Sequence, residues 1–209
     1  MKIIELQYLP QPIYFALLLK EPDFEIDGYE HYVKQSYRNR CRILTANGVD
    51  ELSIPVLGAG KKQISKDIRI DHSQKWLNRN WRAIQSAYGK APFFEYYAED
   101  MLAVYNKKHK YLFDLTQELL TQCLDFLKLD ITLKFTSAYH DLKNEPLNDF
   151  RSKMSPKSNP KILNTLDQFP YQQVFGNNFV NNLSVIDLIF CEGPQAGEII
   201  KSGIVEGTH

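Results

Sequence analysis

The stretch of sequence that decides the fold runs from residue 32 to residue 56 and reads Tyr32-Val-Lys-Gln-Ser-Tyr-Arg-Asn-Arg40-Cys-Arg-Ile-Leu-Thr-Ala-Asn-Gly48-Val-Asp-Glu-Leu-Ser-Ile-Pro-Val56. Its second half carries two alternating apolar segments, 40–45 and 51–57, on either side of Ala46-Asn47-Gly48. Asn-Gly between two alternating segments is the strongest short-range signal for a β-hairpin. We therefore predict a hairpin around Asn47-Gly48.

The first half of this stretch, residues 32–42, combines four cations, two phenols and two amides. Arginine makes bidentate contacts with carboxylate or phosphate, and tyrosine and asparagine bind hydroxyl groups. The composition predicts a site for an anion or a sugar, with these substrate-binding residues: Lys34, Arg38, Asn39 and Arg40. An extended segment would place Lys34, Ser36, Arg38 and Arg40 on one face. The alternative is a solvated strand edge studded with cations, which discourages edge pairing.

Three side chains beside the basic run are candidates for moving protons. His31 has an ordinary pKa near 6.5, which suits a general base at neutral pH. The phenols of Tyr32 and Tyr37 are the other two catalytic candidates. The alternative for His31 is a surface position in a turn after Gly28.

A second candidate site lies near the C-terminus. Ser184-Val-Ile-Asp187 has the pattern of a capping box that opens a helix. The amides of that helix start, preceded by Asn182, could bind an anion together with Ser184. A catalytic pair of Ser184 and Asp187 is the other interpretation. Cys41 is interpreted as a buried small hydrophobe, with a thiolate nucleophile as the alternative.

The remaining periodicity favours an α/β or α+β fold, in which a mixed sheet carries the hairpin and helices pack against it. We predict strands at 2–9, 24–28, 66–71 and 131–137, and helices at 13–20, 73–88, 98–107, 109–127 and 194–203. The strands at 2–9, 24–28 and 131–137 are expected to be parallel neighbours. Residues 141–168, rich in Asn, Ser, Lys and Pro, predict a mobile loop within a single domain spanning residues 1–209.

Composition limits the functional classes. The 209 residues include 25 basic and 25 acidic side chains, and this balance argues against nucleic acid as a partner. No apolar run reaches the roughly 18 residues of a membrane span, and no secretory signal is visible, so we expect a cytoplasmic protein. The three cysteines have no metal-ligand spacing, and dinucleotide and phosphate-loop motifs are missing. We therefore predict neither metal nor cofactor, and the sequence leaves the oligomeric state open.

The motifs resemble those of the WbqC-like proteins, most closely the branch common in Bacteroidetes. The blocks that carry the resemblance are Tyr32-x-Lys34-Gln35-Ser36-Tyr37-Arg38-Asn39-Arg40, Ala46-Asn47-Gly48, Leu52-Ser-Ile-Pro55-Val56, Ile68-x-Ile70-Asp71, Trp76, Trp81, Ala87-Tyr88-Gly89, Pro92-Phe93-Phe94, Tyr171-Gln172-x-Val174-Phe175 and Asn182-Leu183-Ser184-Val-Ile186-Asp187-Leu188. These blocks occur in order and cover nearly the whole chain outside residues 140–165.

The resemblance implies a biosynthetic pathway rather than a particular reaction. WbqC-like proteins are found among genes for bacterial surface polysaccharide and O-antigen, and one activity associated with that setting is transfer of an acyl or aminoacyl group to an amino sugar. Many members begin with His-Gln-Pro-x-Tyr. Here the corresponding segment reads Gln7-Tyr-Leu-Pro-Gln-Pro-Ile-Tyr14, so a mechanism based on that histidine is in doubt.

Two hypotheses follow for the anionic small molecule, such as a sugar nucleotide, that the basic run would bind. The first is a transferase, which should place a titratable group in a perturbed environment within hydrogen-bond reach of the basic residues. The second is a non-catalytic component of the same pathway that binds a sugar nucleotide or a protein. Such a component should show the cations alone or spread over an exposed face.

Overall fold

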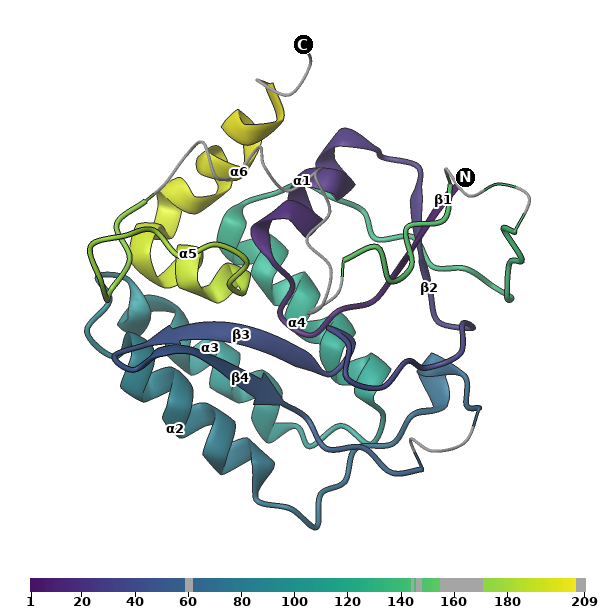
Figure 1. Cartoon of the computed structure of the whole chain (residues 1–209), viewed down its shortest axis with the longest axis horizontal. Coiled ribbons are helices and arrows are strands. Elements are labelled where there is room, and N and C mark those ends of the chain that lie inside the picture. The colour runs from purple at the N-terminus through teal and green to yellow at the C-terminus, as the bar shows by residue number, and fades with distance from the viewer. Residues whose placement is uncertain (59–61, 144, 146–147, 155–170, 206–209) are drawn as a thin grey trace.

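The predicted hairpin is confirmed (Figure 1). In the computed structural model, which describes residues 1–58, 62–143, 145, 148–154 and 171–205, β3 (Arg40–Thr45) pairs antiparallel with β4 (Gly48–Ser53). Thr45 lies opposite Gly48, whose φ is +101°, and the Thr45 hydroxyl donates to the Gly48 carbonyl oxygen at 2.8 Å. Neither Ala46 nor Asn47 has a positive φ, so the turn is not the type I′ turn that Asn-Gly usually forms.

The predicted parallel pairing is confirmed, but within the described residues these strands form a sheet separate from the hairpin, so the single mixed sheet that we predicted is wrong. β1 (Lys2–Glu5) pairs with β2 (Phe24–Asp27), and Lys2 lies opposite Phe24. Single parallel bridges join Ile3 to Asp149 and Ile26 to Phe135. Four extended segments therefore lie side by side in the order 148–150, β1, β2, 134–136.

These strands are shorter than the sequence predicts. β1 ends at Glu5 rather than residue 9, and the predicted strand 131–137 makes only one bridge in the described structure, at Phe135. β2 ends because the Asp27 carboxylate accepts a hydrogen bond from the backbone N–H of Tyr29 at 2.8 Å, which turns the chain. β1 then has no ladder partner beyond Glu5.

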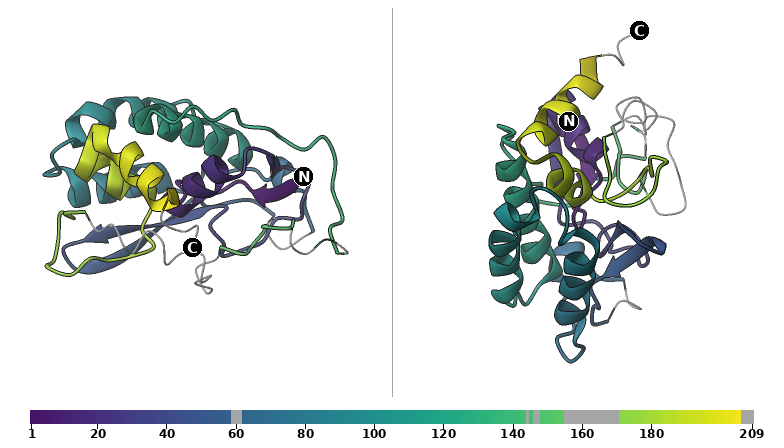
Figure 2. Two further views of the ribbon diagram at one scale, coloured as in Figure 1. Left: turned by 90° about the horizontal axis from the view of Figure 1, so that it is seen from above. Right: turned by 90° about the vertical axis from the view of Figure 1, so that its left-hand side faces the viewer.

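Six α-helices are present in the described part of the chain. They are α1 (Pro12–Lys20), α2 (Trp76–Tyr88), α3 (Phe94–Asn106), α4 (Leu112–Leu127), α5 (Val185–Glu192) and α6 (Ala196–Val205), with short 3₁₀ turns η1 (Ser65–Asp67) and η3 (Gly193–Gln195). Figure 2 shows α2, α3 and α4 as a layer along one side of the hairpin.

Two predicted boundaries and one predicted strand are wrong for local reasons. Ser73 does not cap α2, because its N–H and hydroxyl both donate to the Asp71 carboxylate in the turn before the helix. α3 begins at Phe94 rather than 98, where the buried Phe94 ring belongs to the core. The predicted strand 66–71 is instead the turn η1 followed by isolated bridges at Arg69 and Ile70.

One buried apolar cluster joins both sheets to the helices. It includes Ile4 and Ile26 of the parallel sheet, Ile43 of the hairpin and Leu119 of α4. Cys41 lies in the same cluster, where burial raises the pKa of its thiol well above the ordinary value, in line with the small-hydrophobe interpretation. No helix of the described part has the length and apolar character needed to cross a bilayer.

Part of the predicted mobile loop, 141–168, lies outside the described residues, namely 144, 146–147 and 155–168. The described residues 148–154 lie against β1. The backbone N–H of Phe150 donates to the Ile3 carbonyl oxygen at 2.8 Å, and Met154 is buried.

Candidate functional site

Buried charged side chains gather at the carboxyl ends of the parallel segments. Glu5 ends β1 and Asp27 ends β2, and both are almost completely buried. Gln7 donates to Glu5 at 2.7 Å, and the backbone N–H of Ser152 donates to the other Glu5 oxygen at 2.8 Å. Open α/β sheets bind ligands outside the carboxyl ends of their strands, so this end is the first place to expect a site.

Asp27 connects three chain segments that follow neighbouring strands. One carboxylate oxygen accepts hydrogen bonds from the backbone N–H of Tyr29 at 2.8 Å and from the Thr136 hydroxyl at 3.1 Å. The other oxygen accepts a hydrogen bond from Arg151 Nη1 at 2.8 Å. Arg151 also pairs with Asp149 at 2.7 Å. The carboxylate thereby fixes the loops that surround this end of the sheet.

Arg38, a predicted substrate-binding residue, is paired with Glu30. Two parallel hydrogen bonds of 2.6 Å join them, Nε to Oε1 and Nη2 to Oε2, and the side chains are only 4% and 6% exposed. Ser65 also donates to Glu30 at 3.3 Å. Burial raises the pKa of Glu30, and the bonds from Arg38 oppose that rise without cancelling it. A buried carboxyl with a raised pKa is therefore within hydrogen-bond reach of the basic run.

A cavity of about 10 Å³, roughly the room that one water molecule needs, lies between this pair and the end of β2. Its polar lining comes from Asp27, Glu30, Tyr32, Arg38 and Ser65, and α4 supplies an apolar wall that includes Phe113. Burial raises the pKa of the Tyr32 phenol to about 12, and the positive charges of Arg38 and Arg40 oppose that rise. Two residues singled out from the sequence, Tyr32 and Arg38, thus line the same pocket.

The next two residues of the basic run carry buried polar atoms that have no partner within the described residues. Asn39 Nδ2 donates to the Ile54 carbonyl oxygen at 2.8 Å, but its Oδ1 has no donor. Arg40 Nη1 donates to Glu51 at 2.7 Å, but its Nε has no acceptor. Buried polar atoms are normally satisfied, so these two call for a partner such as a water or a ligand.

The basic run does not present one continuous cationic face. Residues 34–39 form turns rather than an extended strand, and Lys34 is exposed. His31 is also exposed, next to the ring of Tyr139 at 6.3 Å. Tyr37 is buried, and burial raises the pKa of its phenol. Of the residues predicted from this run, Tyr32 and Arg38 meet at the pocket.

The predicted C-terminal residues lie elsewhere. Ser184 is the N-cap of α5, as expected, and its hydroxyl accepts from the Ile186 N–H at 3.4 Å. Asp187 does not complete a capping box, because it points into the core. There it accepts hydrogen bonds from the Tyr171 hydroxyl at 2.6 Å and from Gln173 at 3.1 Å. Asn182, with φ +62°, and Ser184 do not line the pocket.

Four members of the charged cluster were not singled out from the sequence: Glu5, Asp27, Glu30 and Arg151. Glu5 and Asp27 each end an apolar strand, and an acidic residue at that position was the available signal. Arg151 sits in the segment expected to be mobile, and no local pattern pairs it with Asp27. Within the described residues, no group of His, Cys, Asp and Glu side chains is arranged to hold a metal ion.

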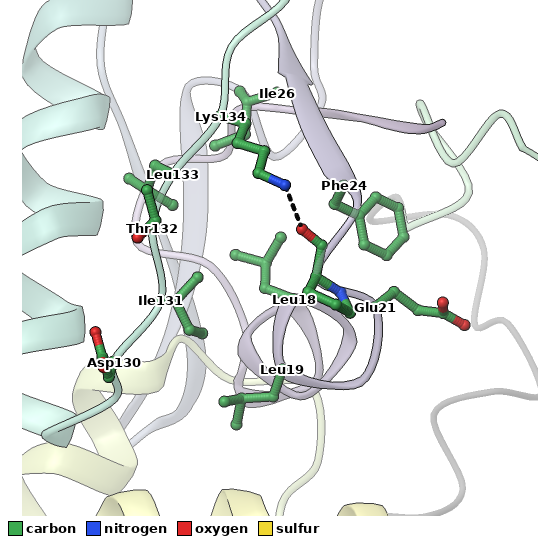
Figure 3. A pocket seen from close by; sticks show the side chains of 11 residues that line it. Leu18, Leu19, Glu21, Phe24, Ile26, Asp130, Ile131, Thr132, Leu133 and Lys134 are labelled. Carbon is green, nitrogen blue, oxygen red and sulfur yellow. Dashed lines mark hydrogen bonds between the residues drawn. The ribbon is translucent and has the colours of Figure 1, made fainter.

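A larger, mostly apolar pocket lies at the other end of β2 (Figure 3). Its volume is about 300 Å³, and it lies between the end of α1, the start of β2 and residues 130–134. Figure 3 shows Lys134 at its edge, donating to the Pro22 carbonyl oxygen at 3.1 Å. None of the site residues predicted from the sequence lines it.

Comparison with known proteins gives one family. A model of the WbqC-like protein family matches residues 7–157 and 157–199. The uncharacterised protein Rv1507c of Mycobacterium tuberculosis is 25% identical over 224 aligned positions, which cover 95% of this chain and 96% of that protein. No solved structure matches the chain.

Proposed function

The chain belongs to the WbqC-like protein family, and on that premise we propose that it is a cytoplasmic enzyme of surface-polysaccharide biosynthesis that transfers an acyl or aminoacyl group to an amino-sugar nucleotide. One observation carries the proposal. Glu30, a buried carboxyl with a raised pKa, is hydrogen-bonded to Arg38 at the wall of a pocket that Tyr32 also lines. That is the arrangement expected of an enzyme rather than of a simple anion-binding surface.

Glu30 is the candidate general base. In acyl transfer to an amino sugar, the amine nitrogen bonds to the carbonyl carbon of an activated donor, such as a thioester. The bond to the leaving group breaks, and the amine gives up a proton. A base works best when its pKa is close to the working pH, and burial moves Glu30 in that direction. The bidentate contact with Arg38 holds the carboxylate in place.

Asn39 and Arg40 are the candidates for holding the substrate. The unpaired Nε of Arg40 can donate to a phosphate oxygen, and the unpaired Oδ1 of Asn39 can accept from a sugar hydroxyl. Arg38 is engaged by Glu30 and acts in this scheme by orienting the base.

The binding half of the proposal is tested by thermal shift against amino-sugar nucleotides, acyl donors and plain nucleotides. A ligand at about 100 times its Kd stabilises the folded state by about 2.7 kcal/mol, which is visible as a rise in Tm. We expect an amino-sugar nucleotide to raise the Tm of the wild type and of Arg82→Ala, a control at an exposed position on α2. Arg40→Ala should lose the shift. If no sugar nucleotide moves the wild-type Tm, the proposal is wrong.

The catalytic half separates an enzyme from a binding component. Glu30→Gln keeps the shape of the side chain but cannot accept the proton of the amine. It also leaves the Arg38 charge unpaired, so circular dichroism must show that the variant folds before its rate is compared. For an enzyme, we expect binding of the sugar nucleotide to persist and the rate of transfer to fall by about 10²–10⁴. Wild-type protein that binds a sugar nucleotide but transfers no acyl or aminoacyl group from the donors would support the non-catalytic alternative.

A further inference from the structure

We infer that Tyr139, held by Arg151 and His31, is the subsite that stacks on the nucleobase of the substrate. The inference rests on the proposed function because it concerns the same ligand, and it goes further by assigning one end of that ligand to a place on the surface. Tyr139 is not among the candidate site residues predicted from the sequence.

Tyr139 is a half-exposed ring that contacts two neighbouring side chains. Its side chain is 52% exposed. The Arg151 guanidinium carbon lies 5.3 Å from the ring centroid, and the His31 ring lies at 6.3 Å with an interplanar angle of 32°. An apolar ring left in water gains free energy when a flat ligand covers it, and a ring that is already oriented loses less entropy on binding.

A chain of contacts connects this ring to the pocket. Arg151 contacts Tyr139 on one side and donates to Asp27 at 2.8 Å on the other, and Asp27 lines the pocket. His31, which lies beside Tyr139, directly precedes Tyr32, a second pocket residue. Tyr139 is therefore linked to the pocket through Arg151 and Asp27, next to the carboxyl ends of the parallel segments.

The charges beside Tyr139 and at Arg40 decide which part of a sugar nucleotide each of these residues can bind. Beside Tyr139, the Arg151 guanidinium is already paired with two carboxylates, Asp27 and Asp149, so it has no spare positive charge for a phosphate. Arg40 retains an unpaired Nε and is the better phosphate contact. A flat, uncharged ring suits the Tyr139 end, and a nucleobase is the flat ring of a sugar nucleotide.

The test is calorimetric titration of wild type, Tyr139→Ala, Tyr139→Phe and Tyr96→Ala with uridine and guanosine diphosphates, N-acetylglucosamine 1-phosphate and inorganic diphosphate. Tyr96, on α3, is 75% exposed and serves as the matched control. Stacking on an aromatic ring predicts that Tyr139→Ala weakens nucleoside diphosphate binding by about 5- to 150-fold. Binding of inorganic diphosphate should be unchanged. Tyr139→Phe and Tyr96→Ala should bind like the wild type.

The outcomes separate this inference from the proposed function. If Tyr139→Ala binds nucleoside diphosphates as the wild type does, the stacking subsite is wrong while Arg40-dependent binding still stands. If Tyr139→Ala weakens only N-acetylglucosamine 1-phosphate, the ring binds a sugar, which also overturns the nucleobase assignment. If the wild type binds none of these ligands or any sugar nucleotide, both proposals are wrong. Circular dichroism of Tyr139→Ala checks that the exposed substitution leaves the fold intact.

Discussion

At the scale of single residues, the basic run contains two ion pairs that differ in burial. Arg38 and Glu30 are almost fully buried, whereas Arg40 and Glu51 are about one-third exposed. Removing one partner of a buried pair leaves an uncompensated charge, which costs about 3–5 kcal/mol, while an exposed pair contributes at most about 1 kcal/mol. We therefore expect Arg38→Met to lower the free energy of unfolding far more than Arg40→Met.

The double variant Arg38→Met/Glu30→Leu shows whether a buried, unpaired charge is the reason for the large loss of stability expected of Arg38→Met. It removes both charges of the pair, so it should recover most of the stability that Arg38→Met alone loses. Urea unfolding of the four proteins, with wild type as reference, measures these differences. Equal losses for Arg38→Met and Arg40→Met would contradict the burial seen for the Arg38–Glu30 pair.

Asp187 predicts a pH dependence of stability. Burial raises its pKa, against the opposing hydrogen bonds from Tyr171 and Gln173. The folded protein thus holds this proton at pH values where the unfolded chain, with an aspartate pKa of about 3.9, has released it. The contribution of Asp187 is fully present below that unfolded value and is lost as the pH rises through the raised, folded one.

Asp187→Asn removes this titration while keeping an acceptor oxygen for the Tyr171 phenol. The free energy of unfolding of the variant, relative to wild type, should increase as the pH rises above about 4. Asp100→Asn, at an exposed position on α3, is the control and should track the wild type. Parallel pH profiles for Asp187→Asn and wild type would show that the carboxyl is not perturbed in the folded state.

At the scale of elements, the sequence predicts best those helices and strands that residues close together in the chain determine. Asn47-Gly48 placed the hairpin, and the stripe of Leu115, Leu119 and Cys123 placed α4, because hydrogen bonds and apolar faces within a few residues decide those elements. The end of β2 depends instead on the turn at Asp27, and the start of α2 depends on the bonds of Ser73 to Asp71. Side-chain bonds of this kind leave no periodic pattern in a sequence.

Two glycines allow the packing of the elements to be tested. A Cβ at Gly197 would lie 2.0 Å from the carbonyl oxygen of Leu127, so α6 rests directly on the end of α4. A Cβ at Gly48 would meet nothing within 4 Å, and only the φ of +101° opposes a side chain there. Gly48→Ala should therefore cost about 1–2 kcal/mol, from backbone strain alone.

Gly197→Ala should cost more, about 3 kcal/mol or above, because backbone atoms must separate to admit the methyl group. Thermal unfolding of the two variants beside the wild type gives the comparison. A Gly197→Ala protein as stable as Gly48→Ala would mean that α6 does not pack tightly on α4.

At the scale of the whole molecule, the candidate site shows what a sequence leaves out. Arg38 and Tyr32 were found because basic and phenolic residues are concentrated in one run. Their partners are Glu30, from the loop after β2, and Asp27, which is bound by Arg151 from 124 positions further along the chain. Only the parallel arrangement of β1, β2 and the segments 134–136 and 148–150 brings these groups to one end of a sheet.

The same arrangement predicts that the chain unfolds as one unit. A single buried cluster contains Ile4 and Ile26 of the parallel sheet together with Trp76 and Ile84 of α2, and α1 packs against α6 from the opposite end of the sequence. Segments that share one core lose their packing together, so a single cooperative transition is expected. Fluorescence of Trp76 and Trp81 reports on α2, whereas hydrogen exchange at the Ile3 and Ile26 amides reports on the parallel sheet.

These two probes should give the same free energy of unfolding in urea, because neither region has a separate core to retain. Far-UV circular dichroism, which follows all helices, serves as the reference for both. If the tryptophan transition occurred at a clearly different urea concentration from the loss of protection at Ile3 and Ile26, the parallel sheet and the helical layer would be separate folding units. The expectation of a single domain would then be wrong, and the pocket at the carboxyl ends of the strands would lie at the boundary between the two units.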